Sequence, residues 1–350
     1  MKELDFEQYI REGEPDKKEK SVAWSIATGL QQVDGLTPSQ YLYETARRNI
    51  EGEITIEDAK QLIESYYESK TVRTTEERNE READEVSSRI ALLLKEKSFN
   101  FGLTQMLAIH ERLFKGVLFG VKAGKFRGYN ITKREWALDG DTVLYAPHDL
   151  IKETVVYDLE AERKIDYSKL SEDEAVAHIA RFTADLWQIH PFGEGNTRTT
   201  AVFVIKYLRS LGFIVDNKPF EDNSWYFRNS LVRANYTNVQ KSIYSDSKYL
   251  ERFFRNLLLG EHNELKNRYT HIRYTEEVAK GSEKKFGEKQ KSSEKILFLL
   301  KSDPRLSARK IAEELGISSR AVEKQIASLV KQGLLRREGS PKGGHWVVLK

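Results

Sequence analysis

Long stretches of this chain carry apolar residues three and four positions apart, which is the spacing of amphipathic α-helices. Only 7 of the 350 residues are proline, so few positions would interrupt such helices. One helix is predicted to begin at a capping box formed by Ser171 and Glu174. Its buried face is predicted to hold Val176, Ile179, Phe182, Leu186 and Ile189. The pattern predicts a mainly α-helical protein.

A second helix is predicted from about Thr197 to Leu211, because Gly212 supplies a C-terminal stop directly after it. The spacing of its apolar residues predicts that one stripe faces the core. The residues expected on that stripe are Val204, Ile205, Leu208 and Leu211.

The exception to the helical pattern lies between Ile131 and Tyr145. Two short segments, 131–138 and 142–145, flank the sequence Asp139-Gly140-Asp141, which is typical of a tight turn. The segment therefore predicts a β-hairpin, and a lone hairpin in a helical chain must pack on helices.

The composition excludes several classes of protein. The absence of cysteine excludes disulfides, thiolate zinc sites and cysteine nucleophiles. No apolar run approaches the roughly 18–20 residues of a bilayer crossing, and the first residues lack the pattern of a secretory signal. A length of 350 residues suggests two or three domains. We therefore expect a cytoplasmic, multidomain protein without a membrane contact.

Charge is distributed unevenly along the chain. Residues 261–350 contain 20 Lys and Arg against 12 Asp and Glu, a net charge of +8. Residues 1–260 contain 37 against 42, a net charge of −5. A basic region favours contact with nucleic acid, although a lysine-rich linker produces the same asymmetry.

After Gly260 the pattern changes in a way that predicts a separate C-terminal domain. Residues 261–291 are charged and poor in aliphatic side chains, as exposed linkers are. The order of the elements beyond them, a helix, a helix-turn-helix and a β-wing, describes a winged helix. The expected elements are helices at 293–300, 307–315 and 319–332, a turn at 316–318, and two strands within 334–349.

The most informative segment runs from Ile189 to Arg198, where one helix ends, a tight loop follows and another helix begins. Backbone N–H groups at a helix start have no intrahelical partner, so a glycine-containing loop there forms an anion site. In such a site Glu194 suits Mg²⁺ and Arg198 suits a second phosphate. His190 can accept a proton from a hydroxyl at neutral pH. Each residue alone is more often structural, but together they predict a nucleoside triphosphate site.

This segment resembles the signature of Fic-domain proteins, His-Pro-Phe-x-Asp/Glu-Gly-Asn-Gly-Arg-x-x-Arg. Such proteins transfer AMP, and less often other phosphate-containing groups, to protein hydroxyls. The resemblance implies that His190 is the general base and Glu194 the Mg²⁺ ligand. It also implies that Gly195 to Arg198 bind the nucleotide phosphates. The matching residues are His190, Pro191, Phe192, Glu194, Gly195, Asn196 and Arg198.

The sequence departs from the family signature at two positions. Thr197 replaces a glycine, which a first helical turn tolerates. Ala201 stands where the family has its second arginine, which usually contacts the γ-phosphate. The preferred nucleotide therefore stays open.

The resemblance extends over about residues 34–259. The hairpin lies where the family carries a flap that aligns the target chain by strand pairing, and the flap residues would be Ile131, Thr132, Lys133 and Arg134. Residues 225–235 resemble the helix that contacts the base. We expect Asn235 to hydrogen-bond adenine and Tyr226 to stack on it, with core packing as the alternative for Tyr226.

Glu51-Gly52 resembles part of a second family motif, an inhibitory helix with the pattern Ser/Thr-x-x-x-Glu-Gly/Asn, expected here at about residues 41–52. Arg47 occupies the Ser/Thr position, and residues four apart share a helix face. One hypothesis is that Arg47, or else Arg198, pairs with Glu51 in place of the arginine missing at Ala201. The alternative is that Arg47 faces solvent and the inhibition is weakened.

Residues 306–320 resemble the helix-turn-helix of bacterial winged-helix domains. Arg320 and Lys324 would then project from the second helix toward a DNA groove, with Lys342 near the wing tip. Glu323 on the same face weakens this interpretation. Winged helices also serve in dimerisation and protein docking, and that alternative stays open.

These observations predict a mainly α, Fic-type helical core with a flap and a C-terminal winged helix. The expected domains are a helical region at 1–90, the Fic core at 91–260, the linker at 261–291 and the winged helix at 292–350. The predicted function is autoinhibited transfer of AMP from ATP, with Mg²⁺, to a Ser, Thr or Tyr hydroxyl of a target protein or of the chain itself. Removal of AMP, a nucleotide-sensing DNA-binding regulator, and homo-oligomer formation stay open.

Overall fold

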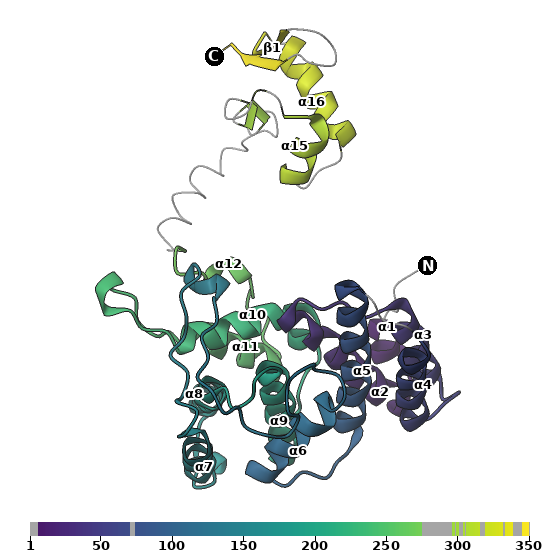
Figure 1. The fold of residues 1–350 in the computed structure, drawn as a ribbon, viewed down its shortest axis with the longest axis vertical. Coiled ribbons are helices and arrows are strands. Elements are labelled where there is room, and N and C mark those ends of the chain that lie inside the picture. Colours follow the sequence, from purple (N-terminus) through teal and green to yellow (C-terminus); the bar gives the residue numbers. More distant parts are fainter. Residues whose placement is uncertain are drawn as a thin grey trace. The chain divides into compact units, whose positions relative to one another are not determined.

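The computed structural model divides the chain into two compact units, Met1–Tyr274 and Thr275–Lys350 (Figure 1). It describes residues 6–70 and 74–274 of the first unit. In the second unit it describes residues 296–297, 299–300, 304, 306–315, 319–331, 333–338 and 345–349. None of the helices in these described parts combines the length and apolar character that a bilayer crossing requires.

The regular elements of the first unit are all helices among its described residues, apart from one isolated β-bridge between Asn238 and Ile243. This confirms the predicted fold class. Its helices are α1 (Phe6–Glu12), α2 (Pro15–Gly29), η1 (Leu30–Asp34), α3 (Gln40–Glu51), α4 (Ile56–Ser69), α5 (Thr75–Lys95), α6 (Leu103–Phe114), η2 (Trp136–Leu138), α7 (Ile151–Glu162), η3 (Tyr167–Lys169), α8 (Glu172–Ile189), α9 (Asn196–Ser210), α10 (Lys218–Ala234), η4 (Val239–Lys241), α11 (Lys248–Leu259) and α12 (Asn267–Thr270).

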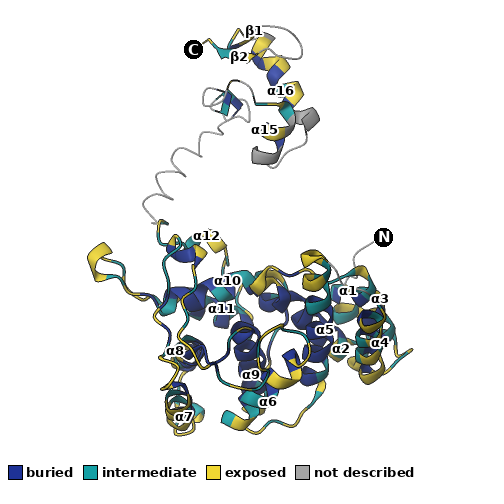
Figure 2. Ribbon diagram, in the orientation of Figure 1, coloured by how far each residue is buried: buried dark blue, intermediate teal, exposed yellow. Residues whose placement is uncertain are grey.

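Helix α9 lies at the centre of the first unit, in contact with α5, α6, α8 and η1 (Figure 1). Figure 2 shows it as buried, and its residues from Asn196 to Leu208 are all buried. The predicted stripe is confirmed except at Leu211, whose side chain is 41% exposed because it follows the last helical residue. Gly212 adopts the left-handed conformation of a helix stop, with φ of 91°.

Helix α8 begins at the predicted capping box. The Ser171 side chain accepts from the Glu174 N–H, and the Glu174 carboxylate accepts from the Ser171 N–H. The five residues predicted for its buried face are buried. This face packs against α7, α9, α10 and α11, which holds the C-terminal end of α8 rigidly beside the start of α9.

The hairpin predicted at residues 131–145 is wrong in its strands but right in its turn. Residues 131–145 contain no strand, and Trp136–Leu138 forms the 3-10 helix η2. Asp139 and Gly140 both have positive φ, and the Glu135 N–H donates to the Asp141 carbonyl at 2.9 Å. Residues 136–138, predicted to belong to the first strand, instead form the 3-10 helix η2.

The N-terminal helices pack directly on the core of the first unit. Helix α2 contacts α5 and α10, and η1 contacts α9 and α10. The backbones of α2 and α10 approach closely at Gly29, where a Cβ would lie 2.3 Å from the Phe220 carbonyl oxygen. The packing places η1 beside the first turn of α9.

The second unit contains α15 (Ala308–Leu315), α16 (Ser319–Lys331) and an antiparallel pair of strands, β1 (Leu335–Glu338) and β2 (His345–Val348). Its core includes Ile311, Val322, Ile326, Leu329 and Leu335. These elements agree with the predicted helix-turn-helix and wing. Half of the helix expected at 293–300, the turn at 316–318, Lys342 and the Arg320 side chain lie outside the described residues.

Candidate active site

The loop between α8 and α9 is held in a sharp turn by two left-handed residues. His190, directly after α8, has φ of 50°, and Gly195, directly before α9, has φ of 76°. A Cβ on Gly195 would lie 2.4 Å from the Phe114 ring. Position 195 therefore requires glycine both for its conformation and for its space.

The His190 side chain is buried, with 2% exposure, and packs against the rings of Tyr145 and Trp187. Its Nδ1 lies 3.3 Å from the Trp187 carbonyl oxygen. A carbonyl only accepts, so Nδ1 carries the proton and Nε2 carries the lone pair. Burial, and next the charge of Lys133, hold the pKa of His190 well below its usual 6.5. The imidazole is thus neutral and can accept a proton at Nε2.

Arg127 anchors the backbone around His190, and sequence reasoning missed it. Its Nε donates to the His190 carbonyl at 2.8 Å, and its Nη atoms donate to the carbonyls of Tyr129 and Ala146 at 2.5 Å. The Arg127 N–H donates to the Pro191 carbonyl at 2.9 Å. One buried guanidinium therefore joins the loop between α8 and α9 to the segments on both sides of η2.

Phe192 anchors the loop in the core. It is fully buried and stacks on His110 with a centroid separation of 3.7 Å. The His110 ring accepts from the Gly124 N–H at 2.9 Å and donates to the Glu194 carbonyl at 3.1 Å. These partners require a neutral ring, and burial lowers the pKa of His110 to about 4. His110 lies 84 residues from Glu194 in sequence, so no local pattern could have revealed this contact.

The first turn of α9 is rigid. The Asn196 side chain accepts from the Phe192 N–H at 2.9 Å and donates to the Phe192 carbonyl at 2.8 Å. The Thr197 hydroxyl accepts from the Trp187 indole at 3.0 Å. Because the first N–H groups of a helix have no intrahelical acceptor, this turn offers donors to an anion. Thr197 fits without strain because its side chain faces α8.

Glu194 is the carboxylate at the mouth of the loop. Its side chain is 54% exposed, and Lys133 of the flap segment lies 2.9 Å from it. No cluster of three or more His, Cys, Asp or Glu side chains suitable for a metal occurs among the described residues. A metal here would therefore depend on Glu194 and on ligands from a substrate.

Arg198 is almost fully buried, with its guanidinium directed at the N-terminal helices. Nη1 donates to Gln31 at 3.0 Å and Nη2 donates to Glu82 at 2.5 Å. Nε lies 2.9 Å from the Asp34 carboxylate, an ion pair whose geometry is not that of a hydrogen bond. The guanidinium also lies 4.8 Å above the Phe114 ring.

The loop between α8 and α9 lies in a region that matches a known family. Residues 100–208 match the model of the Fic/DOC family, and this range contains the whole loop with His190 and Arg198. Residues 290–336 match a winged helix-turn-helix DNA-binding model. The chain contains a Fic/DOC-family domain. The resemblance of the loop and of the C-terminal region is thereby confirmed.

Several solved structures match the chain. The N-terminal Fic domain of Bep8, a VirB-translocated effector from Bartonella sp. 1-1C, is 19% identical with a TM-score of 0.42, and covers 54% of this chain and 88% of its own. BepC from Bartonella tribocorum, solved with bound AMPPNP, is 20% identical with a TM-score of 0.41 and coverages of 55% and 89%. A Fic family protein from Desulfovibrio desulfuricans G20 is 14% identical with a TM-score of 0.41 and coverages of 98% and 89%. No curated protein matches.

The hypothesis about the inhibitory glutamate of the Fic domain is wrong in its partners. Glu51 accepts from the Tyr9 hydroxyl and from Lys17, both at 2.6 Å, whereas Arg47 pairs with Glu53 at 3.4 Å. The hydrogen bond from Lys17, and next that from Tyr9, lower the pKa of Glu51. The partners of Glu51 therefore come from α1 and α2, whereas those of Arg198 come from η1 and α5.

Two residues proposed for the base occupy other environments. Tyr226 is fully buried in the hydrophobic core of the first unit, so the core-packing alternative is correct and the stacking role is wrong. The Asn235 amide donates to the carbonyls of Ala184 and Leu231 at 2.9 and 3.0 Å, which ties the end of α10 to α8. Its NH₂ donors are therefore committed within the protein.

The flap segment is anchored by a buried carboxylate. Glu135 is fully buried and accepts from Arg228 at 2.6 Å and from the Tyr145 hydroxyl at 3.0 Å. Of the four predicted flap residues before it, Thr132 and Arg134 are exposed, and Ile131 and Lys133 are partly buried. Since Tyr145 also packs on His190, the flap anchor and the imidazole share one neighbour.

Proposed function

We propose that this protein is an adenylyltransferase, which transfers AMP from ATP to a Ser, Thr or Tyr hydroxyl of a target protein. The observation that carries the proposal is a buried, neutral His190 whose Nε2 is free to accept a proton beside the N-terminus of α9. The match of this loop to the Fic/DOC family supports it.

The first turn of α9 fits the phosphates of a nucleotide. Its N–H groups lack intrahelical partners, and the helix dipole favours negative charge there. Gly195 allows close approach of a ligand to the backbone because it has no side chain. The Asn196 side chain holds Phe192 on both its N–H and its carbonyl, so the turn is preformed.

A Mg²⁺ ion fits this site through Glu194 together with phosphate oxygens. Mg²⁺ typically binds one or two carboxylates and completes its coordination with phosphates and water. When bound, the ion would neutralise negative charge on the phosphates of the nucleotide. Lys133 pairs with Glu194 at 2.9 Å, so it must release the carboxylate before the ion is held there.

In the proposed reaction, Nε2 of His190 takes the proton of the target hydroxyl. The hydroxyl oxygen forms a bond to the α-phosphorus, and the bond between that phosphorus and the bridging α–β oxygen breaks. Pyrophosphate leaves with the negative charge, and the proton remains on the imidazole until it is passed to solvent. Nδ1–H stays bound to the Trp187 carbonyl, which fixes the ring orientation throughout.

We infer further that the Fic domain is held inactive through Arg198, and that Asp34 and Glu82 are responsible. Both carboxylates contact the Arg198 guanidinium, which is therefore unavailable to a phosphate. Ala201, at the position of the second family arginine, is fully buried and uncharged. Arg198 is consequently the arginine of the motif at residues 190–201 with which an inhibitory carboxylate can pair.

The test is covalent labelling by ATP that carries ³²P at the α-phosphate, in the presence of Mg²⁺ and of cell extract as a source of targets. We expect label on proteins with the wild type and none with His190→Ala. The double substitution Asp34→Asn and Glu82→Gln keeps shape but removes charge, and it should raise labelling several-fold. Glu51→Gly is the matched control and should leave labelling unchanged.

Each outcome separates the two parts of this proposal. If neither the wild type nor the Asp34/Glu82 variant transfers label, AMP transfer is not the reaction. If labelling occurs but the Asp34/Glu82 variant does not exceed the wild type, the inhibitory role of these carboxylates is refuted. A gain in Glu51→Gly alone would instead restore the inhibitory helix predicted from sequence.

DNA binding by the second unit is a second candidate function, favoured by the match to a winged helix-turn-helix DNA-binding family. Lys324 on α16 is exposed. We expect the full chain to bind duplex DNA with an affinity that falls as salt rises. Lys324→Gln should reduce the slope of log K against log salt by about 1, whereas Lys152→Gln, an exposed lysine of α7, should not. Salt-independent or absent binding at low salt would exclude this function.

A further inference from the structure

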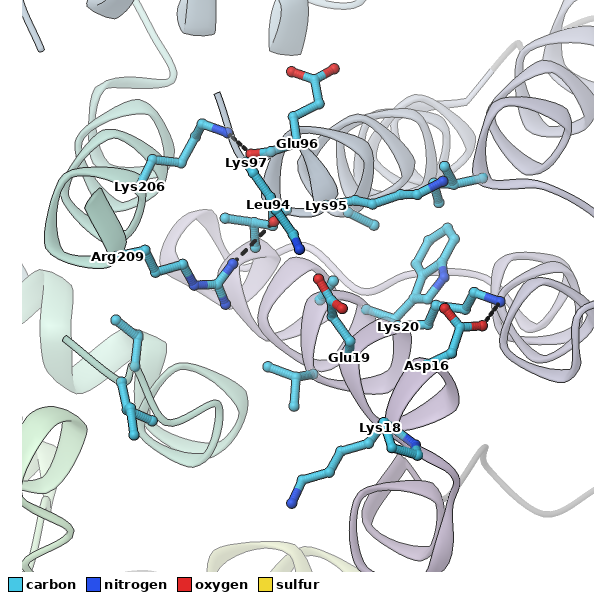
Figure 3. A pocket seen from close by; sticks show the side chains of 18 of the residues that line it. Asp16, Lys18, Glu19, Lys20, Leu94, Lys95, Glu96, Lys97, Lys206 and Arg209 are labelled. Carbon is cyan, nitrogen blue, oxygen red and sulfur yellow. Dashed lines mark hydrogen bonds and ion pairs between the residues drawn. The ribbon is translucent and has the colours of Figure 1, made fainter. Parts of the chain in front are cut away.

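A large pocket lies in the first unit at the end of α9 remote from the catalytic loop (Figure 3). Its volume is about 830 Å³, within the usual range for small-molecule sites. It is lined by the first turns of α2, the last turn of α5, the last turn of α9 and the segment after α9. At a rise of 1.5 Å per residue, Arg209 in this pocket lies about 20 Å along α9 from Asn196. The pocket is thus separate from the nucleotide site.

The walls of the pocket are mainly apolar. Leu94 and Val215 are nearly buried, Val22 and Phe99 are half-buried, and the side chain of Ile214 on the rim is 87% exposed. A large aliphatic side chain exposed to this degree, beside other apolar groups, is typical of a surface that binds an apolar ligand.

Cations without a carboxylate partner face this apolar surface. Arg209 is desolvated by burial, which lowers its pKa, and its Nη1 donates to the Leu94 carbonyl at 3.1 Å. Among the described residues, no carboxylate lies within ion-pair distance of Arg209, Lys18 or Lys97. In Figure 3 the Arg209 guanidinium and the Lys97 amine point into the space that the pocket encloses.

Most other charges of the pocket are already paired or held. Lys20 pairs with Asp16 at 2.6 Å, and the Glu96 carboxylate is held by Arg112. Lys206 donates to two backbone carbonyls at the end of α5, those of Leu93 and Glu96, both at 2.6 Å. Lys95 lies 3.9 Å from Glu57, too far for a strong pair.

Glu19 is the one acidic side chain among the lining residues that is not held by a cation. Its charge partly offsets the lowering of the Arg209 pKa by burial, although the two side chains form no ion pair. Against this single carboxylate stand Arg209, Lys97, Lys18 and Lys206, which form no ion pair with a carboxylate of the described residues. The pocket therefore presents a net positive charge beside an apolar wall.

We propose that this pocket binds an organic anion with an apolar body, such as an aliphatic or aromatic carboxylate or sulfonate. The apolar body would cover Leu94, Phe99 and Ile214, and the anionic head would bind Arg209 and Lys97. An inorganic phosphate would leave the apolar wall exposed, and a neutral hydrophobic molecule would leave a desolvated guanidinium without a counter-ion. The apolar wall and the cations together favour a ligand that has both an apolar body and an anionic group.

The test uses 8-anilinonaphthalene-1-sulfonate, an aromatic sulfonate whose fluorescence rises on binding, with the full chain. We expect one saturable site per chain, competition by dodecanoate, and at least tenfold weaker binding of N-phenyl-1-naphthylamine, which has the same aromatic body without the sulfonate. Arg209→Gln should raise the dissociation constant about tenfold or more. Lys152→Gln, an exposed lysine remote from the pocket, should leave it unchanged.

Lys97→Glu provides a second variant, because Lys97 is exposed and its substitution does not disturb the core. It should also weaken binding of the sulfonate at least tenfold. Unchanged affinity in Lys97→Glu, or equal affinity for the neutral analogue, would overturn the proposal. A dimer in sedimentation that Ile214→Asp dissociates, with no sulfonate bound, would assign the pocket to a second copy of the chain and would also overturn it.

Discussion

Replacement of Arg127 by methionine tests how the catalytic loop is held. Arg127 makes four hydrogen bonds to backbone carbonyls, of which those to His190 and Ile189 are buried and those to Tyr129 and Ala146 are partly buried. Methionine keeps the apolar stem but removes every donor. The two partly buried carbonyls can then bind water, whereas the two buried ones cannot.

The expected loss follows from these two buried carbonyls. A buried acceptor left without a partner costs about 1–3 kcal/mol, so Arg127→Met, which leaves two, should lower the free energy of unfolding by about 2–6 kcal/mol. The first unit of 274 residues has an unfolding entropy of about 0.6 kcal/mol/K. The melting temperature of this unit should therefore fall by about 3–10 °C. Labelling by ATP should also fall, because the His190 carbonyl loses its anchor.

Arg163→Met is the matched control. Arg163 is exposed and also donates to a backbone carbonyl, that of Phe101, at 2.7 Å. Water can replace this donor, so the loss should stay below about 1 kcal/mol. Chemical and thermal denaturation followed by tryptophan fluorescence reports on the first unit, which holds four of the five tryptophans. If Arg127→Met is no more destabilised than Arg163→Met, the anchoring role is refuted.

Three further predictions concern the loop and its support. Because the pKa of His190 lies well below 6.5, the rate of AMP transfer should change by less than about twofold between pH 8 and pH 6. A rate that falls with a midpoint near pH 6.5 would contradict a neutral buried base. The pKa of His110 is lowered to about 4, so the stability that the neutral His110 ring contributes is complete above pH 6.5 and falls by about 3 kcal/mol as the pH drops toward 4. Unfolding measured at pH 7 and pH 4.5 should show this loss of stability in the wild type and not in His110→Gln. Gly195→Ala should destabilise the first unit by about 2–4 kcal/mol and abolish labelling, because its Cβ would meet Phe114 at 2.4 Å in a left-handed conformation. Gly212→Ala, with positive φ but open space around it, should cost only about 1 kcal/mol in the same unfolding measurement.

Local patterns in the sequence determined most of the fold and the centre of the site. The capping box at Ser171, the periodic apolar residues of α8 and α9, and the stop at Gly212 after α9 depend on neighbours within a few positions. The short motif from His190 to Arg198 was readable for the same reason. Its residues are adjacent in sequence, and each type has a distinct chemical role.

Tertiary structure alone decided which side chains meet across long sequence separations. Asp34 and Glu82, 164 and 116 residues before Arg198, contact its guanidinium, whereas Glu51, which matches a known motif, does not. Arg127 and His110 support the loop from 63 and 84 residues away. Tyr226, which the sequence placed equally well in a site or in the core, is in the core. The packing of α2, η1 and α5 on α9 determines these contacts, and such packing depends on the whole set of buried faces and not on any single segment.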